Sequence, residues 1–237
     1  MARPPLTRRF DAAVFDLYGT LVPEISRAEF EGTVRAIAAH LDLEPDAFLR
    51  GWSDTASGRQ TGAYPGGLSE NVRAIATGLG ADPPEGEIVA ALSARRAMYA
   101  RRFHPRAGAL ETLEELKRRD YPIGLISMCA PDTPAMWRAG PLAPLVDVEV
   151  FSSETGLRKP DAAIYLLACD RLGVSPDRVL YCGDGSYGEL SGAERVGMTA
   201  IEIREPDVDR SEQLRPEAED WRGATVPDLR DLLPLLP

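Results

Sequence analysis

The feature that most constrains this chain is a short apolar stretch that ends in a carboxylate. Residues 12–15 read Ala-Ala-Val-Phe, and Asp16 follows directly, with Gly19 and Thr20 close behind. An apolar run with β-branched and aromatic members is typical of a strand buried on both faces of a parallel sheet. A carboxylate at the C-terminal end of such a strand lies where open α/β sheets bind their ligands. Gly19 permits a sharp turn there, although an ordinary strand end would look the same.

The second half of the chain alternates between strand and helix patterns. Strands are predicted at 122–127, 146–151, 179–182 and 199–203, and helices at 110–119, 132–138, 164–172, 190–196 and 227–236. This alternation indicates right-handed βαβ units and one parallel sheet, so we predict an α/β fold. Residues 205–222 are polar and acidic without a clear period, and we predict a surface loop there.

Residues 22–103 carry helical patterns and no strand of their own. Ser26 and Glu29 have the spacing of a capping box, and helices are predicted at 26–41, 43–52, 68–79 and 87–103, with a loop at 57–67. The chain therefore divides into a core made of residues 1–21 and 104–237, and an all-helical insert made of residues 22–103.

The overall charge restricts the partners that this chain can have. The 237 residues carry a formal net charge of −10, with a pI of about 4.8. This balance argues against general binding of nucleic acid or of anionic membranes, which need a basic surface. No apolar run approaches the roughly 20 residues that span a bilayer, and the first ten residues contain no apolar segment of a signal peptide. We expect a monomer or weak homodimer whose partner is a small molecule.

The cysteines and histidines point away from metal or redox chemistry of their own. Cys129, Cys169 and Cys182 are odd in number and show no Cys-x-x-Cys spacing. Reduced, buried thiols are the simplest interpretation, and they favour a cytoplasmic location. His40 and His104 have no metal-ligand spacing, and we expect them to be structural or solvent-facing.

Polar side chains recur where the predicted strands end. They are Asp16 with Thr20, Ser127, Lys159, and Asp184 with Glu189. Because the C-terminal ends of parallel strands share one edge of the sheet, these groups can converge. Gathered carboxylates repel each other and need a divalent cation and a lysine to stay ionised, and Mg²⁺ prefers oxygen ligands of this kind. Each residue taken singly also fits a strand end, a charged turn or a helix start.

Such a site suits nucleophilic attack on phosphorus. A carboxylate beside Mg²⁺ and a lysine is a poor base but a usable nucleophile, so Asp16 could form an aspartyl phosphate. Lys159 and the cation would neutralise the charge on the transferring phosphoryl group. Ser127 would donate to a phosphate oxygen, and Thr20 would assist the phosphate or the leaving group.

In order and in position, these segments resemble the motifs of the haloacid dehalogenase-like hydrolase superfamily. Residues 15–21 (Phe-Asp-Leu-Tyr-Gly-Thr-Leu) resemble its first motif, 125–127 the second, 158–165 the third, and 182–198 the fourth. The resemblance covers essentially the whole chain. It implies a Rossmann-like core with a movable helical cap at 22–103 and a nucleophilic Asp16. It also implies metal ligation by Asp16, by the backbone carbonyl of Tyr18 and by Asp184. We assign Glu189 to orient Lys159 or to join the metal site.

Two positions depart from the pattern of the phosphatases in this superfamily. Tyr18 stands where most of them have a second aspartate that serves as general acid and base, and members with tyrosine there include metal-free haloacid dehalogenases. Loss of a general acid/base typically costs about 10²–10⁴ in rate. Met128 and Cys129 follow Ser127, where dehalogenases usually carry asparagine. Asp184 also argues against dehalogenation, because a metal-free site gains little from a further carboxylate.

Three functions therefore stay open. The leading prediction is a Mg²⁺-dependent phosphohydrolase of a small phosphorylated metabolite, with catalytic Asp16, Tyr18, Ser127 and Lys159. The alternative is a metal-independent 2-haloacid dehalogenase that uses Asp16 as its nucleophile. The third is a binding protein of the same fold with weak turnover. Fold alone does not choose among them. We expect Trp52, Tyr64 and neighbouring residues of the insert to set specificity.

Overall fold

A parallel sheet forms the centre of the molecule. The computed structural model describes residues 8–204 and 220–237. Six parallel strands lie in the order β3-β2-β1-β4-β5-β6. Their bounds are β1 Ala12–Phe15, β2 Ile123–Ser127, β3 Val148–Phe151, β4 Val179–Gly183, β5 Thr199–Ile203 and β6 Thr225–Val226. The predicted α/β architecture is confirmed.

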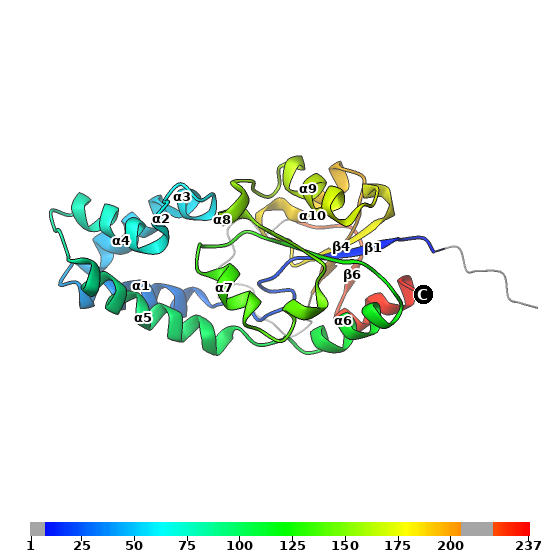
Figure 1. Cartoon of the computed structure of the whole chain (residues 1–237), viewed down its shortest axis with the longest axis horizontal. Helices are drawn as coiled ribbons and strands as arrows, with labels where there is room; N and C mark the ends of the chain where they lie inside the picture. Colours follow the sequence, from blue (N-terminus) through cyan, green and yellow to red (C-terminus); the bar gives the residue numbers. More distant parts are fainter. Residues whose placement is uncertain (1–7, 205–219) are drawn as a thin grey trace, which may run out of the picture.

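Helices surround this sheet and extend beyond it at one end (Figure 1). The α-helices are α1 Arg27–His40, α2 Pro45–Asp54, α3 Ala56–Gln60, α4 Gly67–Gly78, α5 Glu85–Arg102, α6 Ala109–Arg118, α7 Thr133–Arg138, α8 Ser152–Thr155, α9 Ala162–Leu172 and α10 Glu189–Arg195. Short 3-10 helices span Ala143–Leu145 (η1), Pro176–Arg178 (η2), Ser186–Gly188 (η3) and Leu229–Leu235 (η5).

Strand β1 divides its side chains between two apolar cores. Ala13 and Phe15 pack with residues of α6 and of the C-terminal 3-10 helix. Ala12 and Val14 pack with residues of α9 and α10 on the opposite face. Because successive side chains of a strand point to opposite faces, a strand covered on both sides must be apolar throughout. All four residues are fully buried, which explains the uninterrupted apolar run.

The order of the strands creates a crevice beside β1. From β1 the chain builds outward through β2 and β3, then crosses to the other side of β1 and builds outward again from β4. The connections therefore diverge between β1 and β4, and a ligand crevice forms at such a switch point, beyond the carboxyl ends of the strands. Asp16 follows β1 and Asp184 follows β4, so both lie at this crevice.

The helical insert has an apolar core of its own. Helices α1 to α5 occupy the chain between β1 and α6, and their inward side chains form a separate cluster that includes Val34, Phe48, Trp52 and Val72. Helix α1 begins with the predicted capping box, in which Ser26 and Glu29 bond to each other's backbone amides. The division at residues 21/22 and 103/104 stays a prediction, but this second core is what an independent cap would need.

One local prediction was wrong, and the C-terminal segment differs from its prediction in detail. Residues 56–60 form α3, not a loop, because Arg59 bonds to the Trp52 carbonyl and to Asn71, and these contacts outweigh a Gly- and Ser-rich composition. The predicted C-terminal helix is present as a 3-10 helix, since Pro234 has no N–H to donate, and the short strand β6, which was not predicted, precedes it. The predicted loop at 205–222 falls almost wholly outside the described residues.

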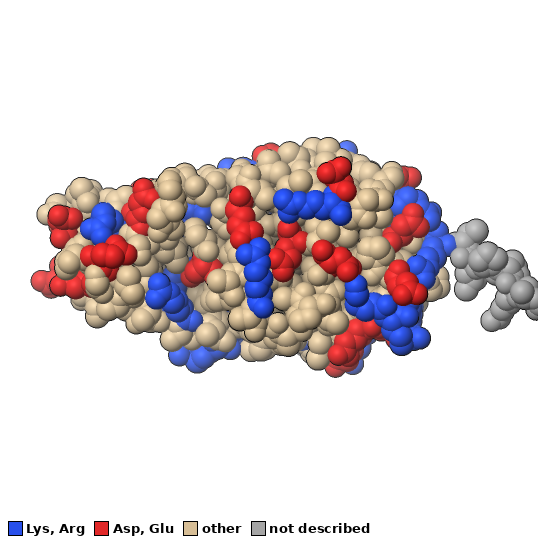
Figure 2. Space-filling model, viewed as in Figure 1, with Lys and Arg blue, Asp and Glu red and all other residues tan. Residues whose placement is uncertain are grey.

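The surface carries both signs of charge. On the face shown in Figure 2, Lys and Arg side chains alternate with Asp and Glu over both the helical insert and the core. Among the described residues, no helix is both long and apolar enough to cross a membrane. The three cysteines are buried and free, and both histidines are exposed, as predicted.

Gly192 controls how closely α10 approaches the segment that carries Lys159. A Cβ atom at residue 192 would lie 2.6 Å from the Tyr165 hydroxyl and 3.0 Å from the Pro160 carbonyl oxygen. We expect Gly192→Ala to lower the free energy of unfolding by about 1–3 kcal/mol through overpacking. Gly32 on α1 has no atom within 4 Å of its corresponding Cβ. Gly32→Ala should instead raise stability by about 0.5–1 kcal/mol. Urea unfolding of both variants tests this, and equal effects would contradict it.

Candidate active site

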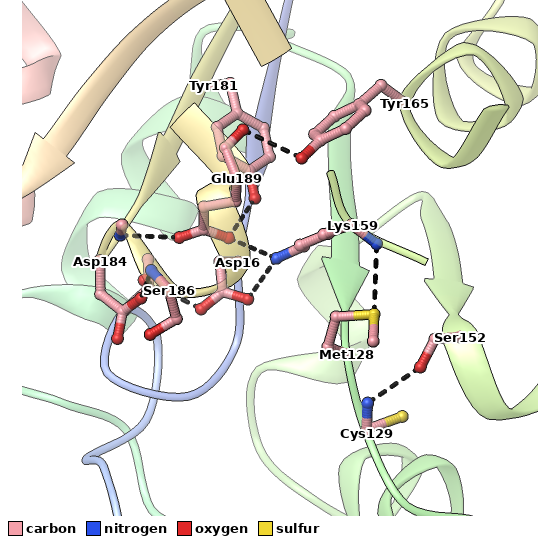
Figure 3. Close-up of polar contacts among 12 residues, drawn as sticks. Asp16, Met128, Cys129, Ser152, Lys159, Tyr165, Tyr181, Asp184, Ser186 and Glu189 are labelled. Atoms are coloured by element: carbon pink, nitrogen blue, oxygen red, sulfur yellow. Dashed lines mark hydrogen bonds and ion pairs between the residues drawn. The ribbon is translucent and has the colours of Figure 1, made fainter. Parts of the chain in front are cut away.

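Lys159 lies at the centre of a buried ionic cluster. Its Nζ atom is 2.5 Å from Asp16 Oδ1 and 2.5 Å from Glu189 Oε2 (Figure 3). The side chains of Lys159 and Glu189 are 1% exposed and that of Asp16 is 10% exposed. Burial lowers the pKa of Lys159, but the two carboxylates outweigh it and raise the pKa above its usual value. The ammonium is therefore a permanent positive charge at this point.

The turn after β1 shapes the surroundings of Asp16. Gly19 adopts a φ of 77°, a conformation that favours glycine, as the sequence predicted. The turn brings Thr20 back so that its hydroxyl donates to Asp16 Oδ2 at 3.2 Å. Burial, and then the nearby Glu189, raise the pKa of Asp16 to about 6 against the opposing effect of Lys159. Lys159 therefore offsets only part of the cost of burying the Asp16 carboxylate.

Glu189 is held by donors on both of its carboxylate oxygens. Oε1 accepts from the Gly185 amide at 3.0 Å, and Oε2 accepts from the Tyr181 hydroxyl at 2.7 Å as well as from Lys159. The Tyr165 hydroxyl donates to the Glu189 carbonyl at 2.9 Å. A Cβ at Gly183 would lie 2.2 Å from Oε1, so only glycine fits there. This arrangement matches the predicted role of orienting Lys159 better than that of a direct metal ligand.

Asp184 completes a group of three buried carboxylates. Asp16, Asp184 and Glu189 each offer one oxygen, and these oxygens lie within 4.8 Å of one another. The Ser186 amide donates to Asp184 Oδ1 at 2.9 Å. Three carboxylates this close together repel one another, and a divalent cation bound between them would offset that repulsion. The residues therefore fit Mg²⁺, with its preference for oxygen ligands.

Ser127 ends β2 at the same edge of the sheet. It is fully buried, and its hydroxyl has no hydrogen-bond partner among the described residues. A buried hydroxyl without a partner is costly, and a ligand oxygen would satisfy it. Of the two residues that follow, Met128 accepts from the Lys159 amide through sulfur, and Cys129 donates its amide to Ser152 Oγ at 3.0 Å. Burial raises the pKa of the Cys129 thiol to about 11, so it is not a thiolate nucleophile at neutral pH.

Tyr18 contacts both the core and the helical insert. Its hydroxyl lies 2.9 Å from Thr133 Oγ1, and its ring packs edge-on against Tyr99 and Phe103, with centroids 6.3 and 6.1 Å away. Burial raises the pKa of the phenol well above 10. Tyr18 is therefore a poor general base at neutral pH, and the contribution of its backbone carbonyl to metal binding stays a prediction.

A cavity of about 330 Å³ lies between the insert and the core. Asp16 and Tyr18 line it from the core, and Trp52, Arg59 and Arg95 from the insert. Of the two residues expected to set specificity, Trp52 lines the cavity, whereas Tyr64 packs against Gly58. Gln60 of α3 donates to the Tyr187 hydroxyl of η3 at 2.8 Å, which joins the insert to the loop after Asp184. The sequence analysis did not predict that Arg59 and Arg95 line this cavity, because the charge pattern of a helix does not distinguish a buried arginine from an exposed one.

Comparison with known proteins decides the family. Residues 10–197 match the haloacid dehalogenase-like hydrolase family. The chain belongs to the haloacid dehalogenase-like hydrolases. A glyceraldehyde 3-phosphate phosphatase of Methanopyrus kandleri is 26% identical over 201 residues, 81% of this hydrolase and 83% of that protein. A phosphoserine phosphatase of Thermus thermophilus is 30% identical and covers 71% of this hydrolase and 63% of its own length.

A haloacid dehalogenase matches a shorter segment of the chain. A (S)-2-haloacid dehalogenase of Burkholderia cepacia is 33% identical over 96 residues, 40% of this hydrolase and 41% of that protein. The crystal structure of a phosphatase from Thermococcus onnurineus superimposes with a TM-score of 0.66 at 20% identity, over 95% of this hydrolase and 97% of that chain. The structural likeness confirms the fold, and the relatives include both phosphatases and dehalogenases.

Substitution of Lys159 tests how much the buried ionic cluster contributes to stability. We expect Lys159→Met to lower the free energy of unfolding of the hydrolase by about 3–5 kcal/mol, because it leaves Asp16 and Glu189 buried without their partner. Lys117 forms a half-exposed pair with Asp147, so Lys117→Met should cost about 0–1 kcal/mol. Urea unfolding at pH 7 with EDTA measures both. Similar losses of unfolding free energy in the two variants would show that the buried cluster stabilises the fold no more than a surface ion pair does.

Proposed function

We propose that this hydrolase is a Mg²⁺-dependent phosphohydrolase of a small phosphorylated metabolite, with an aspartyl-phosphate intermediate on Asp16. The observation that supports this most is the gathering of three buried carboxylates, Asp16, Asp184 and Glu189, whose oxygens lie within 4.8 Å of one another beside Lys159. A metal-free reaction at carbon would gain little from Asp184. The two phosphatase relatives, which align with most of this chain, support the same choice.

The metal ion would be held by Asp16, Asp184 and the backbone carbonyl of Tyr18. When bound, it polarises phosphoryl oxygens and offsets the charge of the carboxylates. Glu189 would act through Lys159, because both of its oxygens already accept hydrogen bonds. Glu189 would therefore contact the metal ion only through a water molecule bound to the metal.

The chain's own groups supply the remaining chemistry. A carboxylate oxygen of Asp16 attacks phosphorus, and the bond from phosphorus to the alcohol oxygen breaks. Lys159 and the Ser127 hydroxyl stabilise the charge on the phosphoryl oxygens, and Thr20 keeps the Asp16 carboxylate in position. Water then attacks the aspartyl phosphate at phosphorus, which releases phosphate and restores the carboxylate.

Proton transfer is the weak point of this cycle. Tyr18 replaces the aspartate that would serve as acid and base, and its hydroxyl is engaged with Thr133. The alcohol must therefore take its proton from water. Tyr18 and the dehalogenase relative are the observations that favour the alternative, a 2-haloacid dehalogenase in which Asp16 displaces halide from carbon. A binding protein with weak turnover is the third possibility.

The expected partners follow from the same features. We propose a small phosphorylated substrate, no nucleic acid and no membrane surface, in keeping with a net charge of −10. We also propose a monomer or weak homodimer, and a cytoplasmic location fits the three buried, free cysteines.

Metal dependence and Asp184 provide the first test. Hydrolysis of p-nitrophenyl phosphate should be lost in EDTA and restored by Mg²⁺. Asp16→Asn should reduce turnover to background, and Asp184→Asn should lower kcat/KM by on the order of 10²–10³. Glu194→Gln, an exposed change on the same helix as Glu189, should have no effect.

Other outcomes would select another function. Phosphate release that EDTA leaves unchanged would contradict the metal-dependent mechanism. Halide release from 2-chloropropionate at pH near 9, with no phosphatase activity, would establish the dehalogenase. If Asp16→Asn changes no measured turnover, only the binding protein survives.

Substitution of Tyr18 tests its place in the cycle. Tyr18→Asp should raise phosphatase turnover on the order of 10²-fold, because it supplies the missing acid and base. The same change removes the ring contacts with Tyr99 and Phe103, so the free energy of unfolding should fall by about 1–3 kcal/mol. Steady-state kinetics and urea unfolding of one preparation measure both effects. Unchanged or lower turnover in a folded variant would refute this role.

A further inference from the structure

Arg59 is a buried cation at the wall of the active-site cavity. It lies on α3, is 5% exposed, and lines the cavity that also contains Asp16. Its guanidinium stacks on the Trp52 ring, with 4.2 Å from Cζ to the ring centroid. All its hydrogen bonds within the described residues are made by Nη1, to the Trp52 carbonyl, Thr55 Oγ1 and Asn71 Oδ1. Nε and Nη2 donate to no described residue.

No described carboxylate pairs directly with this guanidinium, and Asp132 acts on it only at longer range. Within the described residues, no Asp or Glu oxygen lies within 4.0 Å of the Arg59 guanidinium, unlike the other buried arginine of the cavity. Arg95 forms a two-pronged ion pair with Asp132, with contacts of 3.0 and 3.3 Å. Burial, together with the nearby Arg95, lowers the pKa of Arg59 to about 10. Burying an unpaired charge is costly, so an anion beside Arg59 would offset that cost.

The two ends of the cavity therefore have different chemistry. The core end holds Asp16, with Lys159 and the carboxylate group beneath it, and suits a phosphoryl group bound with a cation. The insert end holds a guanidinium fixed by three acceptors and an aromatic face, with free donors in the fork geometry that carboxylates and phosphates match. A cavity of about 330 Å³ has room for a small metabolite only.

We propose that the substrate is a small phosphomonoester with a second anionic group, a carboxylate or another phosphate, and that Arg59 binds this group. The inference rests on the proposed phosphohydrolase function. Arg59 thus determines specificity: it contacts the end of the substrate that does not react, while Asp16 acts on the phosphorus. Trp52 and Asn71 hold the guanidinium in place for this contact.

A homologous series of substrates tests the proposal. The series consists of ω-carboxyalkyl phosphates with two to four carbons, the alkyl phosphates of equal length, and the matching alkanediol bisphosphates, each assayed with Mg²⁺. At the best length, one anionic series should exceed its neutral counterpart in kcat/KM by about 10- to 100-fold, the range for a hydrogen bond to a charged group. The carboxylates and bisphosphates together identify which anion is preferred.

Variants assign the preference to Arg59. In Arg59→Met the ratio between anionic and neutral substrates should fall to near 1, and in Arg59→Lys, which keeps the charge but loses the fork, it should be intermediate. Arg50→Met, an exposed change on α2, should keep the wild-type ratio. A wild-type enzyme that hydrolyses the alkyl phosphates as well as the anionic esters overturns the proposal without any variant, so poor folding of Arg59→Met does not protect it.

A binding measurement separates this proposal from the proposed function. Calorimetry compares phosphonoacetate with ethylphosphonate, and the longer carboxyalkylphosphonates with their alkyl counterparts, none of which needs turnover. Tighter binding of the carboxylates that Arg59→Met abolishes, without phosphatase activity, would refute the phosphohydrolase but retain the anion site. Phosphatase activity with no preference for a second anion, in turnover or in binding, would refute the anion site and retain the phosphohydrolase.

Discussion

The buried ammonium of Lys159 is the contact on which the active-site edge of this hydrolase depends. It lies between Asp16, which follows β1, and Glu189, which begins the helix after β4. Lys159 itself comes from the segment between β3 and α9. Three separate parts of the chain are thus joined by largely buried charges, and each charge is tolerable only while its partners are in place. The sheet edge and the site therefore depend on the same three side chains.

Most of the site follows from the topology of a parallel sheet. Asp16, Ser127 and Asp184 each come directly after an apolar run, and parallel strands end at one edge, so their proximity could be predicted without coordinates. Gly19 was predictable for a similar reason, because a chain that turns back at once needs a residue that tolerates positive φ. The capping box at Ser26 is a local signal and depends on no tertiary contact.

The residues that support the site could not be found in this way. Tyr181 is part of an apolar strand, and only the fold shows that its hydroxyl reaches Glu189. Arg95 finds Asp132 across 37 positions of sequence, so no helical spacing indicates that pair. Helix α3 forms because Arg59 has acceptors in α2 and α4, whereas the local composition favours a loop. Each failure concerns a contact between distant segments, which periodicity does not encode.

Tyr18 lies beside the candidate active site and also packs against the helical insert. It stands two residues after Asp16, the proposed nucleophile, yet its ring is part of the packing between the core and the helical insert. A descendant that exchanged this ring for a small acidic side chain would open a hole beside Tyr99 and Phe103. Larger or shifted neighbours would have to fill that hole. In this lineage, a new reaction at residue 16 and a new shape of the helical insert should therefore be inherited together.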